Sequence, residues 1–210
     1  MKELAARHGF KWTIFRPQVV FGGAAGAAMN PVAVIGAYAA LCRKLALPFT
    51  YPAGVRTVWE ATDAALLAEA LVWARNTPPA HGETFNVTNG DVFVLRDAWN
   101  ELAEWMGLEP CYQQGTSLVD FLASGGAIEA WKSLATEHRL QVPDLASLVG
   151  QSHHYVDMLL DERMVQRGNL PTLVSSIKIR KAGFGACMDS LDSMRGWLRR
   201  MAGTSLLPRF

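Results

Sequence analysis

Two short β-rich segments, separated by helical patterns, constrain the fold of this chain more than any other feature. Residues Lys11 to Arg16 (KWTIFR) are β-rich and are followed directly by Pro17. This pattern predicts a short strand that runs into a loop. Residues Glu83 to Thr88 (ETFNVT) alternate, with Phe85 and Val87 on one side, which predicts a second strand. Two helices lie between these strands and mainly helices follow them. We therefore predict an α/β fold, namely the end of a sheet followed by a mostly helical cap.

The two intervening helices carry recognisable start signals. Asn30 as N-cap and Pro31 as the first helical residue predict one helix, and its apolar run from Val32 to Cys42 is expected to be buried. That run has eleven residues, whereas a spanning helix needs about 20, so we predict no membrane segment. The other helix is predicted to start with Thr62 as its cap and Asp63 in its first turn.

Helical patterns dominate the second half of the chain. The predicted helices cover residues 97–106, 117–123, 127–139, 152–165, 175–182 and 190–201. Residues 1–10 are predicted to be the end of an amphipathic helix closed by Gly9, and they lack the apolar core of a signal peptide. A helix without an N-cap is an unusual start for a domain.

Composition and charge exclude several classes of function. The 210 residues carry a formal net charge of +1, so no global field attracts nucleic acid or an anionic membrane. Cys42, Cys111 and Cys187 lie far apart and form no CxxC motif, which predicts reduced packing thiols in a cytoplasmic protein. Residues 175–210 hold seven basic and two acidic side chains. This bias indicates either a solvated helical face or a site for an anionic partner or a cofactor phosphate.

Familiar catalytic motifs are missing from the sequence. It contains no G-x-G-x-x-G after a strand, no Walker A, no HExxH and no G-x-S-x-G. His153 and His154 are adjacent, and neighbouring residues on a helix point about 100° apart, so they cannot easily share one metal ion. They are either ordinary polar histidines or a functional pair. We assign no catalytic residue and no metal ligand to this chain.

Three segments, in this order, carry a family resemblance: Arg16–Gly22 (RPQVVFG), Trp59–Ala64 (WEATDA) and Phe85–Phe93 (FNVTNGDVF). The sequence resembles the C-terminal part of an extended short-chain dehydrogenase/reductase. It is most similar to the atypical branch that includes progesterone 5β-reductases and iridoid synthases. The stretches Leu148–Asp157 and Ser176–Phe184 also look like that branch, so the resemblance covers essentially the whole chain.

The resemblance implies the end of an NAD(P)-binding Rossmann-type fold, with its last two parallel strands and a mostly helical substrate-binding cap. Residues 1–110 would be the Rossmann-type part with interleaved substrate-domain segments, and residues 111–210 the cap. The implied cofactor is NADP or NAD, and the implied substrate is a small carbonyl or enone compound. The implied cofactor-binding residues are Pro17, Val20, Ala27, Ala28 and Met29.

The same resemblance gives the substrate positions, Val19 and Tyr155. Each assignment has an alternative: the small, Gly-rich segment 21–30 can be a tight connection only, and Tyr155 can be a core residue. The Asn89-Gly90 pair favours a hairpin turn by local rules, but the family places it in a loop after a strand, and we adopt the family's interpretation.

The family's catalytic tyrosine and lysine, Y-x-x-x-K in ordinary members, have no counterpart here. None of the four tyrosines has a lysine four residues later. We therefore expect the chain to be the back half of a larger reductase and inactive alone; the alternative is a non-catalytic remnant that binds a small molecule or a partner. An unpaired parallel strand edge would then favour self-association, with a homodimer as one possible form.

Overall fold

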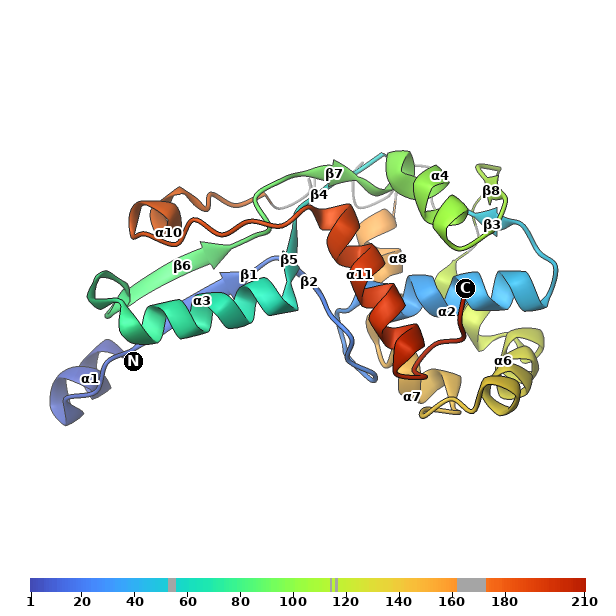
Figure 1. The fold of residues 1–210 in the computed structure, drawn as a ribbon, viewed down its shortest axis with the longest axis horizontal. Helices are drawn as coiled ribbons and strands as arrows, with labels where there is room; N and C mark the ends of the chain where they lie inside the picture. The colour runs from blue at the N-terminus through green and yellow to red at the C-terminus, as the bar shows by residue number, and fades with distance from the viewer. Residues whose placement is uncertain (53–55, 114, 116, 162–172) are drawn as a thin grey trace.

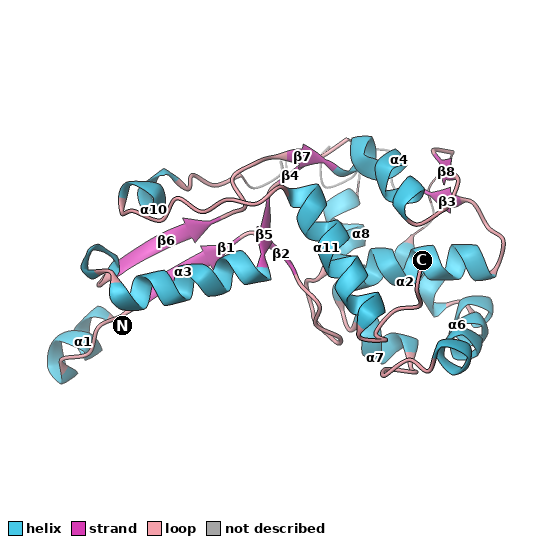
Figure 2. Ribbon diagram, viewed as in Figure 1, coloured by secondary structure: helices cyan, strands magenta, loops and turns pink. Residues whose placement is uncertain are grey.

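The computed structural model describes residues 1–52, 56–113, 115, 117–161 and 173–210 (Figure 1). Helices and short strands are distributed along the chain as an α/β arrangement (Figure 2). The strands are β1 (Thr13–Pro17), β2 (Val19–Phe21), β3 (Phe49–Thr50), β4 (Val58–Trp59), β5 (Ala61–Asp63), β6 (Glu83–Val87), β7 (Phe93–Val94) and β8 (Pro110–Cys111).

The two predicted strands exist and pair in parallel. β1 and β6 run side by side with Thr13 opposite Glu83 and Pro17 opposite Val87. The helix α3 (Ala64–Asn76) lies along them, and the short helix α10 (Ile177–Lys181) returns from the far end of the sequence to lie against β6 (Figure 1). A small apolar core joins these elements, formed by buried residues Leu66, Ala70, Ala74, Ala80, Phe85, Val87, Ile179 and Phe184.

Three further strand pairs were not predicted. β2 pairs with β5 and β3 with β8 in parallel, while β4 pairs with β7 in the antiparallel direction. Each strand of these three pairs is two or three residues long. A period-2 pattern cannot be recognised in a sequence segment that short.

The helix α2 (Pro31–Lys44) is the centre of the larger core. Residues 31–42 are all buried, as the apolar run predicted, and the Asn30 side chain accepts a hydrogen bond from the N–H of Val32 as N-cap. Around it lie further helices that supply most of the rest of this core, together with residues of the short strands. These are α4 (Leu95–Trp105), α5 (Leu118–Ala123), α6 (Gly125–His138), α7 (Leu145–Val149), α8 (Ser152–Leu160) and α11 (Ser190–Gly203).

The start of α3 corrects the sequence prediction by one residue. Asp63, not Thr62, is the N-cap, because its Oδ1 accepts from the N–H groups of Ala65 and Leu66. Thr62 is the middle residue of β5, and its hydroxyl donates to the Val87 carbonyl at 2.8 Å. Thr and Asp are both good caps, so the choice depended on the pairing of β5 with β2.

Asn89-Gly90 forms no hairpin. β6 pairs with β1, β7 pairs with β4, and Asn89 is fully buried between them. The loop interpretation is therefore confirmed. The helix predicted over 152–165 ends earlier, at Leu160, with Asp161 as its extended C-cap, and residues 162–165 lie outside the described residues.

The remaining predictions concern the ends of the chain, the thiols and the membrane. The helix α1 (Lys2–His8) closes at Gly9 as predicted, and none of its residues is buried. Cys42 is a buried packing thiol, but Cys111 is half-buried and Cys187 is exposed, so the packing prediction was wrong for Cys187. Among the residues that the structure describes, no helix is long and apolar enough to cross a membrane.

Candidate functional site

The carboxyl ends of β1 and β6 lie at one edge, because the two strands are parallel. In open α/β sheets, ligands bind in the crevice outside the carboxyl ends of the strands. After β1 the chain passes through Gln18 and continues as β2, which carries Val19 and Val20. Pro17 is exposed, while Val19 and Val20 are half-buried. The loop that follows, residues 22–30, is the candidate site. It is called the cofactor loop below because it contains the predicted cofactor-binding residues Ala27, Ala28 and Met29.

Asn30 folds the cofactor loop back on itself. Its side-chain Nδ2 donates to the carbonyl oxygens of Gly22 at 2.8 Å and Ala24 at 3.3 Å. Its backbone N–H donates to Ser152 Oγ at 3.0 Å. Asn30 is 5% exposed, so these bonds are shielded from water. One residue therefore caps α2 and fixes both ends of the loop.

The turn between α7 and α8 holds the middle of the loop. Ser152 Oγ donates to the Ala27 carbonyl at 2.7 Å, and the Gln151 N–H donates to the same oxygen at 3.2 Å. The Gly26 N–H donates to the Leu148 carbonyl at 2.8 Å. A Cβ on Gly150 would lie 2.5 Å from the Ala27 oxygen, so the turn requires glycine there.

This tethering orients the backbone donors of the loop. The C=O of Ala27 and the N–H of Ala28 belong to one planar trans peptide and point in opposite directions. Because the Ala27 oxygen faces Ser152, the Ala28 N–H points away from the α7–α8 turn. The N–H groups of Ala27, Ala28 and Met29 have no acceptor among the residues that the structure describes. The small side chains of Ala27 and Ala28 leave a ligand room to reach those donors. The Met29 side chain is larger and is 60% exposed.

Close packing fixes the first residues of the loop. A Cβ on Gly23 would lie 3.2 Å from Cε3 of Trp197, and one on Gly22 would lie 3.3 Å from the Cβ of Ala64. Trp197 is held in turn, because its indole Nε1 donates to Asp63 Oδ2 at 2.8 Å. The first residues of the loop, directly after β2, are therefore packed between α3 and α11.

A buried polar network lies behind this point, and sequence reasoning missed it. Asp63 Oδ2 also accepts from Ser193 Oγ at 2.5 Å, and the Asp63 N–H donates to Asn89 Oδ1 at 2.6 Å. Asn89 Nδ2 donates to Ser190 Oγ at 3.0 Å, and that hydroxyl donates to Asp91 at 2.6 Å. The WEATDA and FNVTNGD motifs, which contain Asp63 and Asn89, were the sequence signal for this network. Their partners Ser193 and Ser190 on α11 lie 130 and 101 residues away along the chain.

Tyr155 lies one helical turn after Ser152 on α8, so it is on the same side of that helix as the hydroxyl that holds the loop. Its side chain is half-buried, and burial raises the pKa of its hydroxyl above the ordinary value of 10.0. The phenol is therefore protonated at neutral pH and can donate a hydrogen bond. Neither the structure nor its contacts test whether Tyr155 and Val19 contact substrate, so that assignment stays a prediction.

The histidine pair follows Ser152 directly. The rings of His153 and His154 lie 4.2 Å apart between centroids, with His153 half-buried and His154 exposed. Burial is the main cause that lowers the pKa of His153, with a smaller contribution from His154, while Asp157 opposes both. The described part of the chain holds no group of three or more side chains suited to a metal ion.

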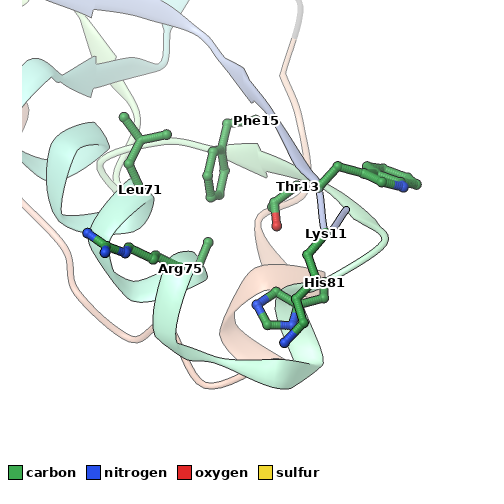
Figure 3. Close-up of a pocket in the computed structure, with 8 residues that line it drawn as sticks. Lys11, Thr13, Phe15, Leu71, Arg75 and His81 are labelled. Carbon is green, nitrogen blue, oxygen red and sulfur yellow. The ribbon is translucent and has the colours of Figure 1, made fainter. Parts of the chain in front are cut away.

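A separate groove lies between β1 and α3. It has a volume of about 270 Å³, and Figure 3 shows Phe15 of β1 with Leu71 and Arg75 of α3 around it. Leu71 is 57% exposed and Val72 is 64% exposed. On the other side, β1 pairs with β6 and, within the described ranges, with no other strand. This groove contains none of the predicted site residues.

Fold and loop together define the class of protein: an α/β chain of Rossmann type, with a small-residue loop after a parallel strand. Its structure is similar to that of the terminal R domain from the myxalamid PKS-NRPS biosynthetic pathway. The TM-score is 0.54 at 15% identity, over 99% of this chain and 47% of that one. No protein-family model matches the sequence.

Two curated relatives narrow the class. The chain is 30% identical to (S)-8-oxocitronellyl enol synthase from Nepeta cataria, over 99% of this chain and 52% of that protein. It is also 30% identical to 3-oxo-Δ4,5-steroid 5β-reductase from Arabidopsis thaliana, over 94% of this chain and 50% of that protein. The chain thus spans about half the length of the curated relatives it matches. Over that half, it is similar to proteins of the progesterone 5β-reductase and iridoid synthase branch of the short-chain dehydrogenases/reductases, which confirms the sequence resemblance.

Proposed function

We propose that this chain forms the nicotinamide-side wall and the substrate cap of an NAD(P)H-dependent reductase that acts on an enone or carbonyl compound. The observation that carries the proposal is the cofactor loop, whose free N–H groups follow a parallel strand and are held by Asn30 and Ser152. The relatives' names support the substrate class, since both describe oxo compounds.

The chain's own residues have three tasks in this proposal. Pro17 and Val20 bring the backbone to the nicotinamide ring, and the amides of Ala27, Ala28 and Met29 donate to the polar groups beside it. Val19 and Tyr155 form the substrate wall. The dinucleotide, when bound, supplies the hydride. The small side chains and free donors of the loop fit the nicotinamide end of such a cofactor.

Turnover requires groups that this sequence does not contain. No tyrosine here has a lysine four residues later, so the proton donor near the substrate oxygen and its assisting cation come from another polypeptide segment. We therefore propose that the isolated 210-residue chain binds the nicotinamide end weakly and does not reduce substrate. Its cofactor is NADPH or NADH.

Titration calorimetry with two ligands tests this proposal. The isolated chain should bind NADPH no more tightly than reduced nicotinamide mononucleotide, because only the nicotinamide end finds partners. Ala28→Glu should weaken the binding of both ligands, because the new carboxylate repels a negatively charged ligand at the loop. Ala68→Glu on the exposed face of α3 is the matched control and should change neither. NADPH binding in the micromolar range, at least tenfold tighter than the mononucleotide, would contradict the proposal.

The alternative function is a non-catalytic binder of a small molecule or a partner, and the edge of β1 that no described strand occupies favours it. The DNA immediately upstream of the Met1 codon separates the two. An open in-frame stretch that encodes a glycine-rich βα turn supports the reductase. A stop codon close to Met1 favours the stand-alone binder.

A further inference from the structure

The basic C-terminal segment separates into two groups in the folded chain. On α10, Lys178 Nζ forms an ion pair with Glu83 Oε2 at 2.6 Å, and this carboxylate balances the charge of Lys178. On and after α11, Arg195, Arg199 and Arg209 line one cavity of about 370 Å³. The other lining residues are apolar, aromatic or small: Trp105, Met106, Leu198, Ala202, Gly203 and Phe210. We call this cavity the arginine pocket.

Arg195 forms the rigid wall of the arginine pocket. Its guanidinium carbon stacks 3.3 Å from the centre of the Trp105 ring. Its ion pairs are long, at 3.5 Å to Glu101 and 4.0 Å to Asp192. Its Nε is buried and has no hydrogen-bond acceptor within the described residues. A buried donor without an acceptor is unfavourable, so this guanidinium has hydrogen-bonding capacity that the described residues do not satisfy.

Arg199 and Arg209 add two further guanidinium groups to the lining of the pocket. Both are exposed, and neither takes part in an ion pair with any described residue. Phe210 completes the wall, and the guanidinium carbon of Arg43 lies 5.6 Å from its ring centre. The pocket thus combines three planar cations with an apolar floor.

The arginine pocket is separate from the cofactor loop. Trp197 and Met201 face Gly23 in the loop. Successive helix residues are rotated by about 100°, so Arg199 projects roughly 200° from Trp197, on the opposite side of α11. A ligand in the pocket would therefore contact neither the loop amides nor Gly23.

We propose that the arginine pocket binds a small amphipathic anion, a carboxylate or phosphate carried on a flat apolar body. Arginine presents a planar fork that matches both oxyanions, and it also stacks on flat rings. The apolar floor formed by Trp105, Met106 and Leu198 takes the uncharged part. The volume lies within the range of small-molecule sites. This site is independent of the proposed reductase function.

Three naphthalene probes test the proposal on the full 210-residue chain. Calorimetry should show 1-naphthoate and 1-naphthyl phosphate binding with Kd values below about 1 mM, and neutral 1-naphthol at least tenfold more weakly. The stronger of the two anions identifies the preferred head group. Equal affinity for 1-naphthol and the anions, or no binding of either anion, would overturn the proposal.

Variants locate the binding. The double change Arg199→Glu and Arg209→Glu should weaken both anions at least tenfold, while Arg7→Glu on α1, which has no buried residue, should leave them unchanged. Ala28→Glu in the cofactor loop should also leave them unchanged. Should the double variant fail to fold by circular dichroism, Arg199→Gln and Arg209→Gln serve singly, each with a several-fold loss. Unchanged affinity in a folded variant would refute the site.

Discussion

The indole Nε1 of Trp197 donates a 2.8 Å hydrogen bond to Oδ2 of Asp63, a residue 134 positions earlier in the sequence. The same carboxylate caps α3 through its other oxygen and accepts from Ser193. Asp63 is 3% exposed, so its carboxylate is largely shielded from water. One side chain thus joins the start of α3, the last helix and the first residues of the cofactor loop.

Asp63→Ala should lower the free energy of unfolding by about 3 kcal/mol. It removes a helix N-cap and leaves two donors without their acceptor, the buried Ser193 Oγ and the half-buried Trp197 Nε1. Urea denaturation followed by circular dichroism measures the change. Glu69→Ala, at an exposed position of α3, is the control and should change it by less than about 0.5 kcal/mol. A loss below 1 kcal/mol for Asp63→Ala would show that the network is not stabilising.

Gly23→Ala and Gly196→Ala should have opposite effects on stability. A Cβ on Gly23 would be 3.2 Å from the Trp197 ring, so alanine should cost about 1–3 kcal/mol by overpacking. Gly196 lies inside α11 with nothing within 4 Å of the added Cβ, so alanine should stabilise by about 0.5–1 kcal/mol. Thermal melts of the two variants provide the comparison, and a shift in the same direction for both would contradict the packing argument.

His153 should make the chain less stable in acid. Burial lowers its folded pKa below the ordinary value of 6.5, so the unfolded chain binds its proton first as the pH falls. The stability from neutral His153 is therefore complete above pH 6.5 and is lost as the pH falls through the folded pKa. In His153→Gln, the unfolding free energy should depend less steeply on pH below 6.5 than it does in the parent chain. Identical slopes in the two proteins would contradict this assignment.

The three thiols should react with Ellman's reagent at very different rates. Cys187 is exposed and should react first, and half-buried Cys111 should follow. Burial raises the pKa of Cys42 to about 12, so almost none of this thiol is in the thiolate form at pH 8. Cys42 should react only after unfolding in guanidinium. In Cys187→Ser the fast phase should disappear, and its persistence would show that another thiol is exposed.

The groove beside β1 should promote self-association of the isolated chain. Leu71 is 57% exposed at this groove, and β1 has an edge that no described strand occupies. Leu71→Lys should lower the average mass measured by size exclusion with light scattering. Met158→Lys, at a 46% exposed position on α8, is the matched control. A monomeric parent chain with a cooperative melt would contradict this prediction and the predicted homodimer.

The sequence alone determined features that depend on neighbouring residues. Strands β1 and β6, the Asn30-Pro31 start of α2 and the buried run after it were predictable, because alternation, caps and helical periodicity act within a few residues. Motifs in the same segments also indicated the family. The assignment of Thr62 as a cap failed because a local rule could not show that β5 pairs with β2.

The tertiary structure decided what depends on distant contacts. The bonds from Asp63 to α11, the support of Ala27 by Ser152, and the gathering of Arg195, Arg199 and Arg209 around one cavity all require the packing of α11 and α8. Ser152 and Ala27 are 125 residues apart, and no local propensity relates such positions. Burial strengthens these hydrogen bonds, and only the folded core determines which polar groups are buried.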